Sequence, residues 1–131
     1  MNINDLDLQT IIFTKENQES IKITEDKLIR FYTTYYCDKK TNKDASGIVI
    51  EIKYATLKGI IKDKNIANYF NNEDIMLNPL ELKMEGLTDK LGNLELTFKK
   101  MMIYEINREI NILTIKLINQ DFIKEDKKEE E

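Results

Sequence analysis

The longest run of alternating apolar and polar residues lies between Leu94 and Ile123. Side chains on a β-strand point to opposite faces in turn, so this alternation predicts strands with one buried and one wetted face. We expect two strands here of about thirteen residues each, against a usual five or six. A polar turn at Asn107, Arg108 and Glu109 would join them, with Ile110 opening the second strand.

The alternation also predicts which side chains of this hairpin are buried. The apolar residues fall on even-numbered positions from Leu94 to Ile106 and on odd-numbered positions from Leu113 to Leu117. We expect these two faces to share one core, so Ile115 should be buried and Lys116 exposed.

Shorter apolar runs predict further strands, at residues 10–15, 21–24, 28–37, 48–54 and 80–85. A helix over 24–31 competes with the third of these, but aromatic and β-branched residues favour a strand. Residues 57–62 would continue the fourth after a bulge at Gly59. The expected fold is mainly β: an antiparallel β-barrel or sandwich of about seven strands with one short α-helix.

The helix is predicted from Asp63 to Phe70. Asp63 would cap its first turn, and the spacing of Ile66, Tyr69 and Phe70 places them on one face. The pattern breaks over 71–78, where Ile75, Met76 and Leu77 are expected to reach the core. Residues 38–47 and 86–93 are predicted to be a ten-residue loop and a turn region.

Size and composition indicate a folded protein with one domain, residues 1–123, and a charged tail at 124–131. The net charge of −4 argues against a dedicated nucleic-acid surface. No apolar run approaches the roughly 20 residues of a membrane-spanning helix, so no membrane partner is expected. The acidic N-terminus does not resemble a secretory signal.

The chemistry-bearing residues do not form a recognisable catalytic pattern. The chain has no histidine and one cysteine, Cys37, so an internal disulfide is excluded and a structural thiol is favoured over a nucleophile. The oxygen-rich segment 71–74 lacks the spacing of a calcium loop. Carboxylates such as Glu81, Glu85, Glu95 and Glu105 fit solvated strand faces, so we predict no catalytic, cofactor or metal site.

Aromatic residues near Arg30 allow two interpretations. Tyr32, Tyr35 and Tyr36 with Arg30 could stack single-stranded bases. Packing of a strand against its neighbours is the favoured interpretation.

The stretch Leu94–Phe122, LELTFKKMMIYEINREINILTIKLINQDF, resembles the end of bacteriophage-type tail tube proteins. The resemblance implies a β-barrel or sandwich with an extended loop, and subunits that stack as hexameric rings with other tail proteins. It also implies a location in a virion or phage-like particle, after assembly from the cytoplasm. The chain lacks the glycine-rich N-terminal opening expected of that family.

The expected function is therefore a structural assembly protein whose main partner is itself. The loop residues Lys39, Lys40, Lys43 and Asp44 are the candidate inter-subunit contacts, because long polar loops often carry function. The alternative is a monomeric β-barrel binding module, such as an immunity or inhibitor protein with an acidic face for a basic partner.

Overall fold

The computed structural model describes residues 7–16, 18–38, 43–58, 60–89 and 92–119. Its strands are β1 (Asp7–Lys15), β2 (Ile21–Thr24), β3 (Leu28–Asp38), β4 (Lys43–Lys53), β5 (Thr56–Leu57), β6 (Ile60–Ile61), β7 (Leu80–Thr88), β8 (Gly92–Glu109) and β9 (Ile112–Asn119). Its helices are α1 (Lys64–Tyr69) and the 3-10 helices η2 (Glu25–Lys27) and η3 (Asn72–Asp74).

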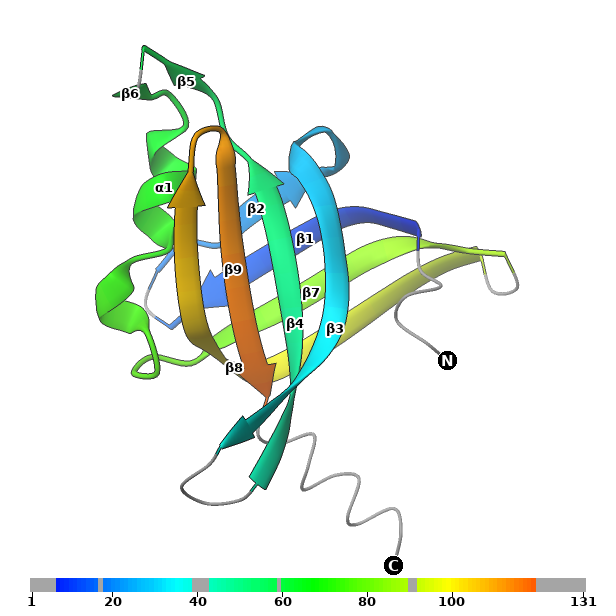
Figure 1. The fold of residues 1–131 in the computed structure, drawn as a ribbon. Coiled ribbons are helices and arrows are strands. Elements are labelled where there is room, and N and C mark those ends of the chain that lie inside the picture. The colour runs from blue at the N-terminus through cyan, green and yellow to red at the C-terminus, as the bar shows by residue number, and fades with distance from the viewer. Residues whose placement is uncertain (1–6, 17, 39–42, 59, 90–91, 120–131) are drawn as a thin grey trace, which may run out of the picture.

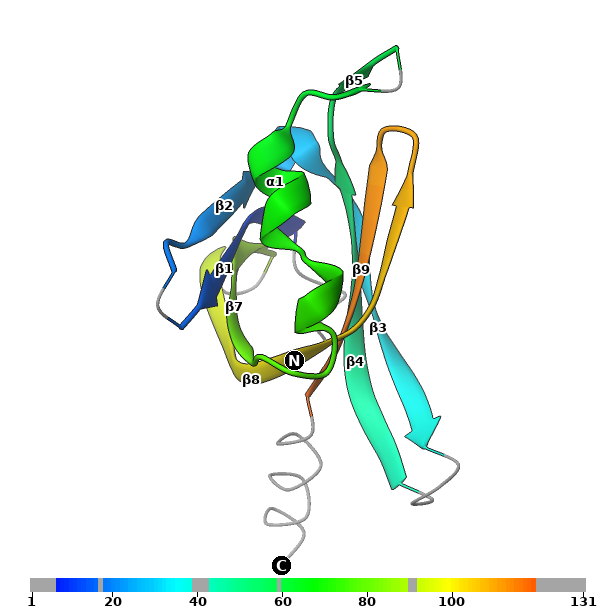
Figure 2. The same ribbon diagram turned by 90° about the vertical axis from the view of Figure 1, so that its left-hand side faces the viewer.

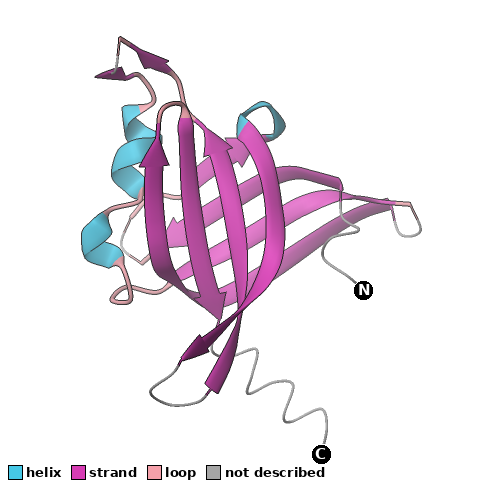
Figure 3. Cartoon of the chain, in the orientation of Figure 1, coloured by secondary structure: helices cyan, strands magenta, loops and turns pink. Residues whose placement is uncertain are grey.

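One antiparallel sheet of seven strands dominates the fold, in the order β2-β1-β7-β8-β9-β4-β3. The prediction of a mainly β protein with one short α-helix is confirmed (Figure 3). The sheet bends over on itself (Figure 1). Its two edge strands, β2 and β3, do not pair with each other in the described part of the chain. The sheet is therefore open, and it does not form a closed barrel.

The bend follows from two bulges in β8, which spans 18 residues and belongs to both halves of the sheet. Its first half pairs with β7 and its second with β9. Between the pairs Leu82–Phe98 and Leu80–Met101, β8 contains one residue more than β7. Lys100 in this bulge has a φ of 59°, a left-handed conformation that re-aims the strand.

These bulges overturn the expected parity of the hairpin. Past the first bulge the buried positions become Met101 and Ile103. A second bulge, between the pairs Ile103–Leu117 and Glu105–Lys116, inserts Tyr104 and returns the inward position to Ile106. The predicted even-numbered face is therefore correct as far as Phe98 and again at Ile106, and wrong at Met101 and Ile103. The odd-numbered face of β9 is confirmed, with Leu113, Ile115 and Leu117 fully buried.

The β8–β9 turn lies later in the chain than predicted. Residues 107–109 remain in β8 and pair with β9. Glu109 pairs with Ile112, and Ile110 and Asn111 form the turn between them, where Asn111 has a positive φ of 64°. Ile110 is 80% exposed, so it does not open the second strand.

The predicted ten-residue loop over 38–47 is also wrong. β3 continues to Asp38, and β4 begins at Lys43, so the two strands pair as far as Asp38–Lys43. Polar residues extend this hairpin because backbone hydrogen bonds form without apolar side chains. The predicted turn over 86–93 is shorter too, since β7 runs to Thr88 and β8 starts at Gly92.

The core lies in the concave side of the sheet and α1 closes one opening of it (Figure 2). Ile66 and Phe70 are buried as predicted, and Phe70 meets Phe13 of β1 edge-to-face at 4.8 Å between ring centroids. Ile75 packs on the core, whereas Met76 and Leu77 are exposed, which corrects the expectation for them.

Three local predictions near these elements are settled by the structure. The strand over 28–37 is confirmed, and the competing helix is reduced to the single 3-10 turn η2. Residues 57–62 do not continue β4 but form the separate β5–β6 ribbon, while Gly59 lies outside the described residues. Asp63 precedes α1 without a capping hydrogen bond to it.

Candidate assembly surface

The long edge strand β3 is the most accessible pairing surface of the sheet. It comprises 11 residues and, among the described residues, pairs only with β4. A strand at the edge of a sheet presents a row of backbone donors and acceptors that another chain can pair with. β3 contains no proline that would block such pairing.

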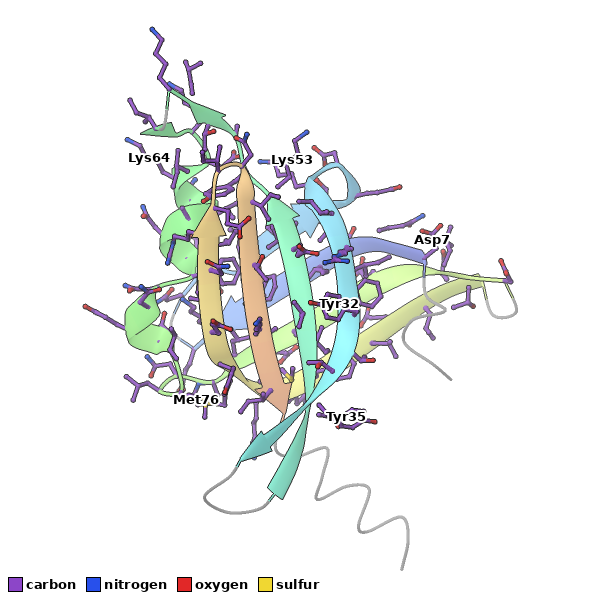
Figure 4. The ribbon with its side chains drawn as sticks, viewed as in Figure 1. Asp7, Tyr32, Tyr35, Lys53, Lys64 and Met76 are labelled. Atoms are coloured by element: carbon purple, nitrogen blue, oxygen red, sulfur yellow. The ribbon has the colours of Figure 1, made fainter. Side chains whose placement is uncertain are left out.

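Exposed apolar side chains accompany this edge. Ile29 is 46%, Tyr32 38% and Tyr35 79% exposed. Ile29 is the extra residue of a bulge between the pairs Leu28–Ile52 and Arg30–Glu51. Figure 4 shows Tyr32 beside the middle of β3 and Tyr35 where the β3–β4 hairpin leaves the body of the sheet. Edge and side chains together offer a surface that is both apolar and able to form backbone hydrogen bonds.

Cross-strand ion pairs cover the outer face of the same sheet. Arg30 pairs with Glu51, and Lys116 Nζ lies 2.8 Å from Glu105 Oε2. Lys116 was expected to be exposed, but it is half-buried and paired. Hydrogen bonding to Glu51 raises the pKa of Arg30, whose guanidinium also lies 5.2 Å from the Tyr32 ring centroid. The carboxylates of Glu51 and Glu105 are thus paired with cations, which fits a structural role.

The aromatic residues near Arg30 do not gather on one face. Tyr32 lies on the outer face with Arg30, whereas Tyr35 has the opposite parity and lies on the face of Phe31. The side chain of Tyr36 lies outside the described residues. The described aromatic residues therefore do not form one stacking platform around Arg30.

The other edge of the sheet is unlike the first. β2 has four residues and pairs only with β1 in the part of the chain described. A depression lies between the beginnings of β1 and β3, and it is lined by Asp7, Leu8, Glu25, Leu28, Ile29, Arg30 and Phe31. The sheet thus has a long edge and a short edge, with an opening between them.

The four predicted contact residues are only partly placed. Lys43 and Asp44 lie in β4, paired with Asp38 and Cys37 of β3, so they belong to a strand and not to a loop. Lys39 and Lys40 lie outside the described residues, as do the side chains of Lys43, Asp44 and Cys37. The edge surface at Ile29, Tyr32 and Tyr35 was not predicted from the sequence. These apolar residues gave a signal only by being exposed, which the sequence does not show directly.

One buried cation lies apart from this surface. Lys15 is 6% exposed and its Nζ donates to Asp74 Oδ2 at 2.8 Å and to the Tyr69 carbonyl. The Lys15 ammonium also lies 4.4 Å from the centroid of the Tyr69 ring. The Asp74 carboxylate accepts hydrogen bonds from Lys15 and Asn78, and these lower its pKa. Burial raises the pKa of Tyr69. The hydrogen bonds of Lys15 and of the Tyr69 hydroxyl join β1 to the α1–η3 region, so the cluster is structural.

Side-chain oxygens of the oxygen-rich segment 71–74 accept hydrogen bonds from other groups of the protein. The Asn71 Oδ1 accepts the Glu73 amide, and Asn72 Oδ1 accepts from Arg108. No group of three potential metal-ligating side chains occurs in the described ranges. No helix there is long and apolar enough to cross a membrane.

Comparisons with protein-family models, curated proteins and solved structures found no match to this chain.

Proposed function

We propose that this protein is a structural assembly subunit that associates with copies of itself through the edge of β3. The observation that carries the proposal is the 11-residue edge strand with its exposed Ile29, Tyr32 and Tyr35. Free edges of this length are usually blocked by prolines, inward charges or covering segments. Pairing with a neighbouring subunit would give hydrogen-bond partners to the backbone N–H and C=O groups of the edge and would cover the apolar side chains.

The two unlike edges favour a ring over a two-fold dimer. A contact between the β3 edge of one copy and the β2 edge of the next is heterologous, and repetition of it gives a closed ring or an open filament. The bend of the sheet would set the curvature of the ring. This arrangement fits a subunit of a tail tube in a phage or phage-like particle, as the resemblance of the C-terminal hairpin implies.

Light scattering after size-exclusion chromatography, followed by negative-stain imaging, tests the proposal. We expect closed rings or tubes. Tyr35→Lys should abolish them, because a charge beside the edge opposes strand pairing. Ile110→Lys is the matched control, since Ile110 and Tyr35 are 80% and 79% exposed. A wild-type protein that stays monomeric at every accessible concentration would overturn the proposal.

A second candidate is a monomeric binding module that captures an extended peptide along β3. The depression between β1 and β3 favours it, because its lining carries the carboxylates of Asp7 and Glu25, whereas its one cation, Arg30, is already paired with Glu51. In this case a basic extended peptide would bind to the monomer, and Tyr35→Lys would weaken that binding.

A further inference from the structure

A protruding end of the molecule carries aliphatic side chains that are largely exposed. This end, which we call the tip, consists of the β5–β6 ribbon and the β8–β9 turn at residues 110–111 (Figure 1). Leu57 is 56%, Ile60 59% and Ile110 80% exposed. Single exposed aliphatic residues are common, but three at one projecting end form an apolar contact surface.

Hydrogen bonds hold the two parts of the tip together. The Tyr54 amide donates to the Asn111 carbonyl at 3.1 Å, and the Thr56 hydroxyl donates to Asn111 Oδ1. The Lys62 amide closes the ribbon by donating to the Ala55 carbonyl at 2.7 Å. The exposed aliphatic side chains are therefore presented by an ordered backbone, which reduces the entropy lost on binding.

Lysines surround these side chains. Lys53, Lys58, Lys62 and Lys64 are exposed, and Figure 4 shows Lys64 where the ribbon joins α1. Asp63 is the only carboxylate between residues 53 and 70. It pairs with Lys27 Nζ at 2.9 Å and accepts the Ala55 amide, and these contacts lower its pKa. Glu109, beside Ile110, and Glu25 and Asp26 of η2 are also exposed.

The chemistry of the tip selects among possible partners. Protein–protein interfaces are enriched in aromatic residues and arginine and depleted of lysine, and the tip has the opposite composition. Nucleic-acid surfaces that stack bases need exposed aromatic rings, whereas Tyr54, at the base of the tip, is buried. Contact between two tips would bring their lysines together, and the like charges would repel each other. Projecting aliphatic side chains flanked by lysines match a bilayer surface with anionic headgroups.

We propose that the tip binds the surface of anionic phospholipid bilayers, with Leu57, Ile60 and Ile110 entering the headgroup region and the lysines contacting lipid phosphates. This is adsorption at the bilayer surface, which needs no apolar run long enough to span a membrane. It does not depend on the proposed assembly.

Sedimentation with sucrose-loaded vesicles tests this inference. Wild-type protein should bind vesicles of phosphatidylcholine with added phosphatidylglycerol, bind pure phosphatidylcholine much less, and dissociate as salt rises. Lys58→Gln/Lys62→Gln should reduce the partition coefficient about 30-fold, at roughly 1 kcal/mol for each lysine near an anionic surface. Leu57→Ser/Ile110→Ser should reduce it at unchanged net charge.

Two control variants separate tip contact from general electrostatics. Lys22→Gln/Lys99→Gln makes the same change in net charge at exposed positions away from the tip, and Leu77→Ser removes an exposed apolar side chain that belongs neither to the tip nor to the β3 edge. Both should bind as wild type does, and all variants should keep the wild-type melting temperature. The inference is overturned if wild-type protein ignores anionic vesicles, or if tip and control variants lose binding equally. It is also overturned if the tip variants change only the oligomeric state.

Discussion

The Lys15 ammonium and the Asp74 carboxylate form an ion pair, with Nζ 2.8 Å from Oδ2, between residues 59 positions apart in the chain. The pair joins β1 to η3 and lies under the Tyr69 ring. Tyr69 reinforces the same junction, because its hydroxyl accepts the Lys15 amide at 3.0 Å and donates to the Phe13 carbonyl. These polar contacts add to the packing of Phe70 and Ile75 in holding the segment after α1 to the sheet.

This pair predicts a loss of stability in acid. The pKa of Asp74 is lowered in the folded protein, so its contribution is present above the ordinary aspartate pKa of about 4 and disappears as the pH falls through the lower folded value. Asp74→Asn should lower the free energy of unfolding by about 2 kcal/mol at neutral pH, since it leaves a buried ammonium short of a charged partner. Urea unfolding across the pH range should show the two proteins converging in acid; a constant difference would exclude the linkage.

A change of charge should have very different effects on stability at two neighbouring positions on β9. Ile115 is fully buried, so Ile115→Lys should prevent folding by placing an unpaired charge in the core. Lys116→Glu should leave the fold intact but cost about 1 kcal/mol, because it faces Glu105 across the ladder. Adding Glu105→Lys to Lys116→Glu should restore the melting temperature. A normal melting transition for Ile115→Lys would disprove the assignment of faces.

The hairpin formed by β3 and β4 allows the predicted loop contact to be tested. Replacing residues 39–42 with Asn-Gly should preserve the pairing as far as Asp38–Lys43 and the thermal stability of the protein, because two residues suffice for a tight turn. If Lys39 and Lys40 contact a neighbouring subunit, rings or tubes should be lost in negative-stain images. Regular assembly of the shortened protein would exclude that role.

Metal removal should have no effect on stability. The oxygens of Asn71, Asn72 and Asp74 accept hydrogen bonds from neighbouring groups, so none is arranged for a cation. Dialysis against a chelator should leave the melting temperature unchanged. A fall of several degrees that added calcium reverses would instead identify an ion site in this segment.

The sequence predicted the strands and the buried face of β9 because alternation at Leu113, Ile115 and Leu117 is a local signal. It did not predict the parity of β8, because the positive φ of Lys100 and the bulge at Tyr104 depend on tertiary bending. The role of Asp63 was mispredicted for the same reason. Its carboxylate accepts hydrogen bonds from the Ala55 amide and Lys27, which only the fold brings close to it. The candidate surface was only partly predictable, since an edge strand is defined by the neighbour it lacks.

The bulge at Lys100 provides the last prediction. Lys100 holds a left-handed φ of 59° at the position where β8 passes from one half of the sheet to the other. This conformation costs a non-glycine residue roughly 1–2 kcal/mol, and glycine avoids the cost. Lys100→Gly should therefore raise the free energy of unfolding by about 0.5 kcal/mol, less than that cost because glycine also loses more backbone entropy on folding.

Lys100→Val should have the opposite effect, because a β-branched side chain tolerates this conformation poorly, and should lower the free energy of unfolding by about 1–2 kcal/mol. Lys99→Val is the matched control, since Lys99 is also exposed and has no positive φ. Valine favours strands, so this control should be neutral or stabilising. Denaturant unfolding of the four proteins gives the comparison. If Lys100→Gly destabilised the protein and Lys100→Val did not, the bend of β8 would have to arise elsewhere than at this residue.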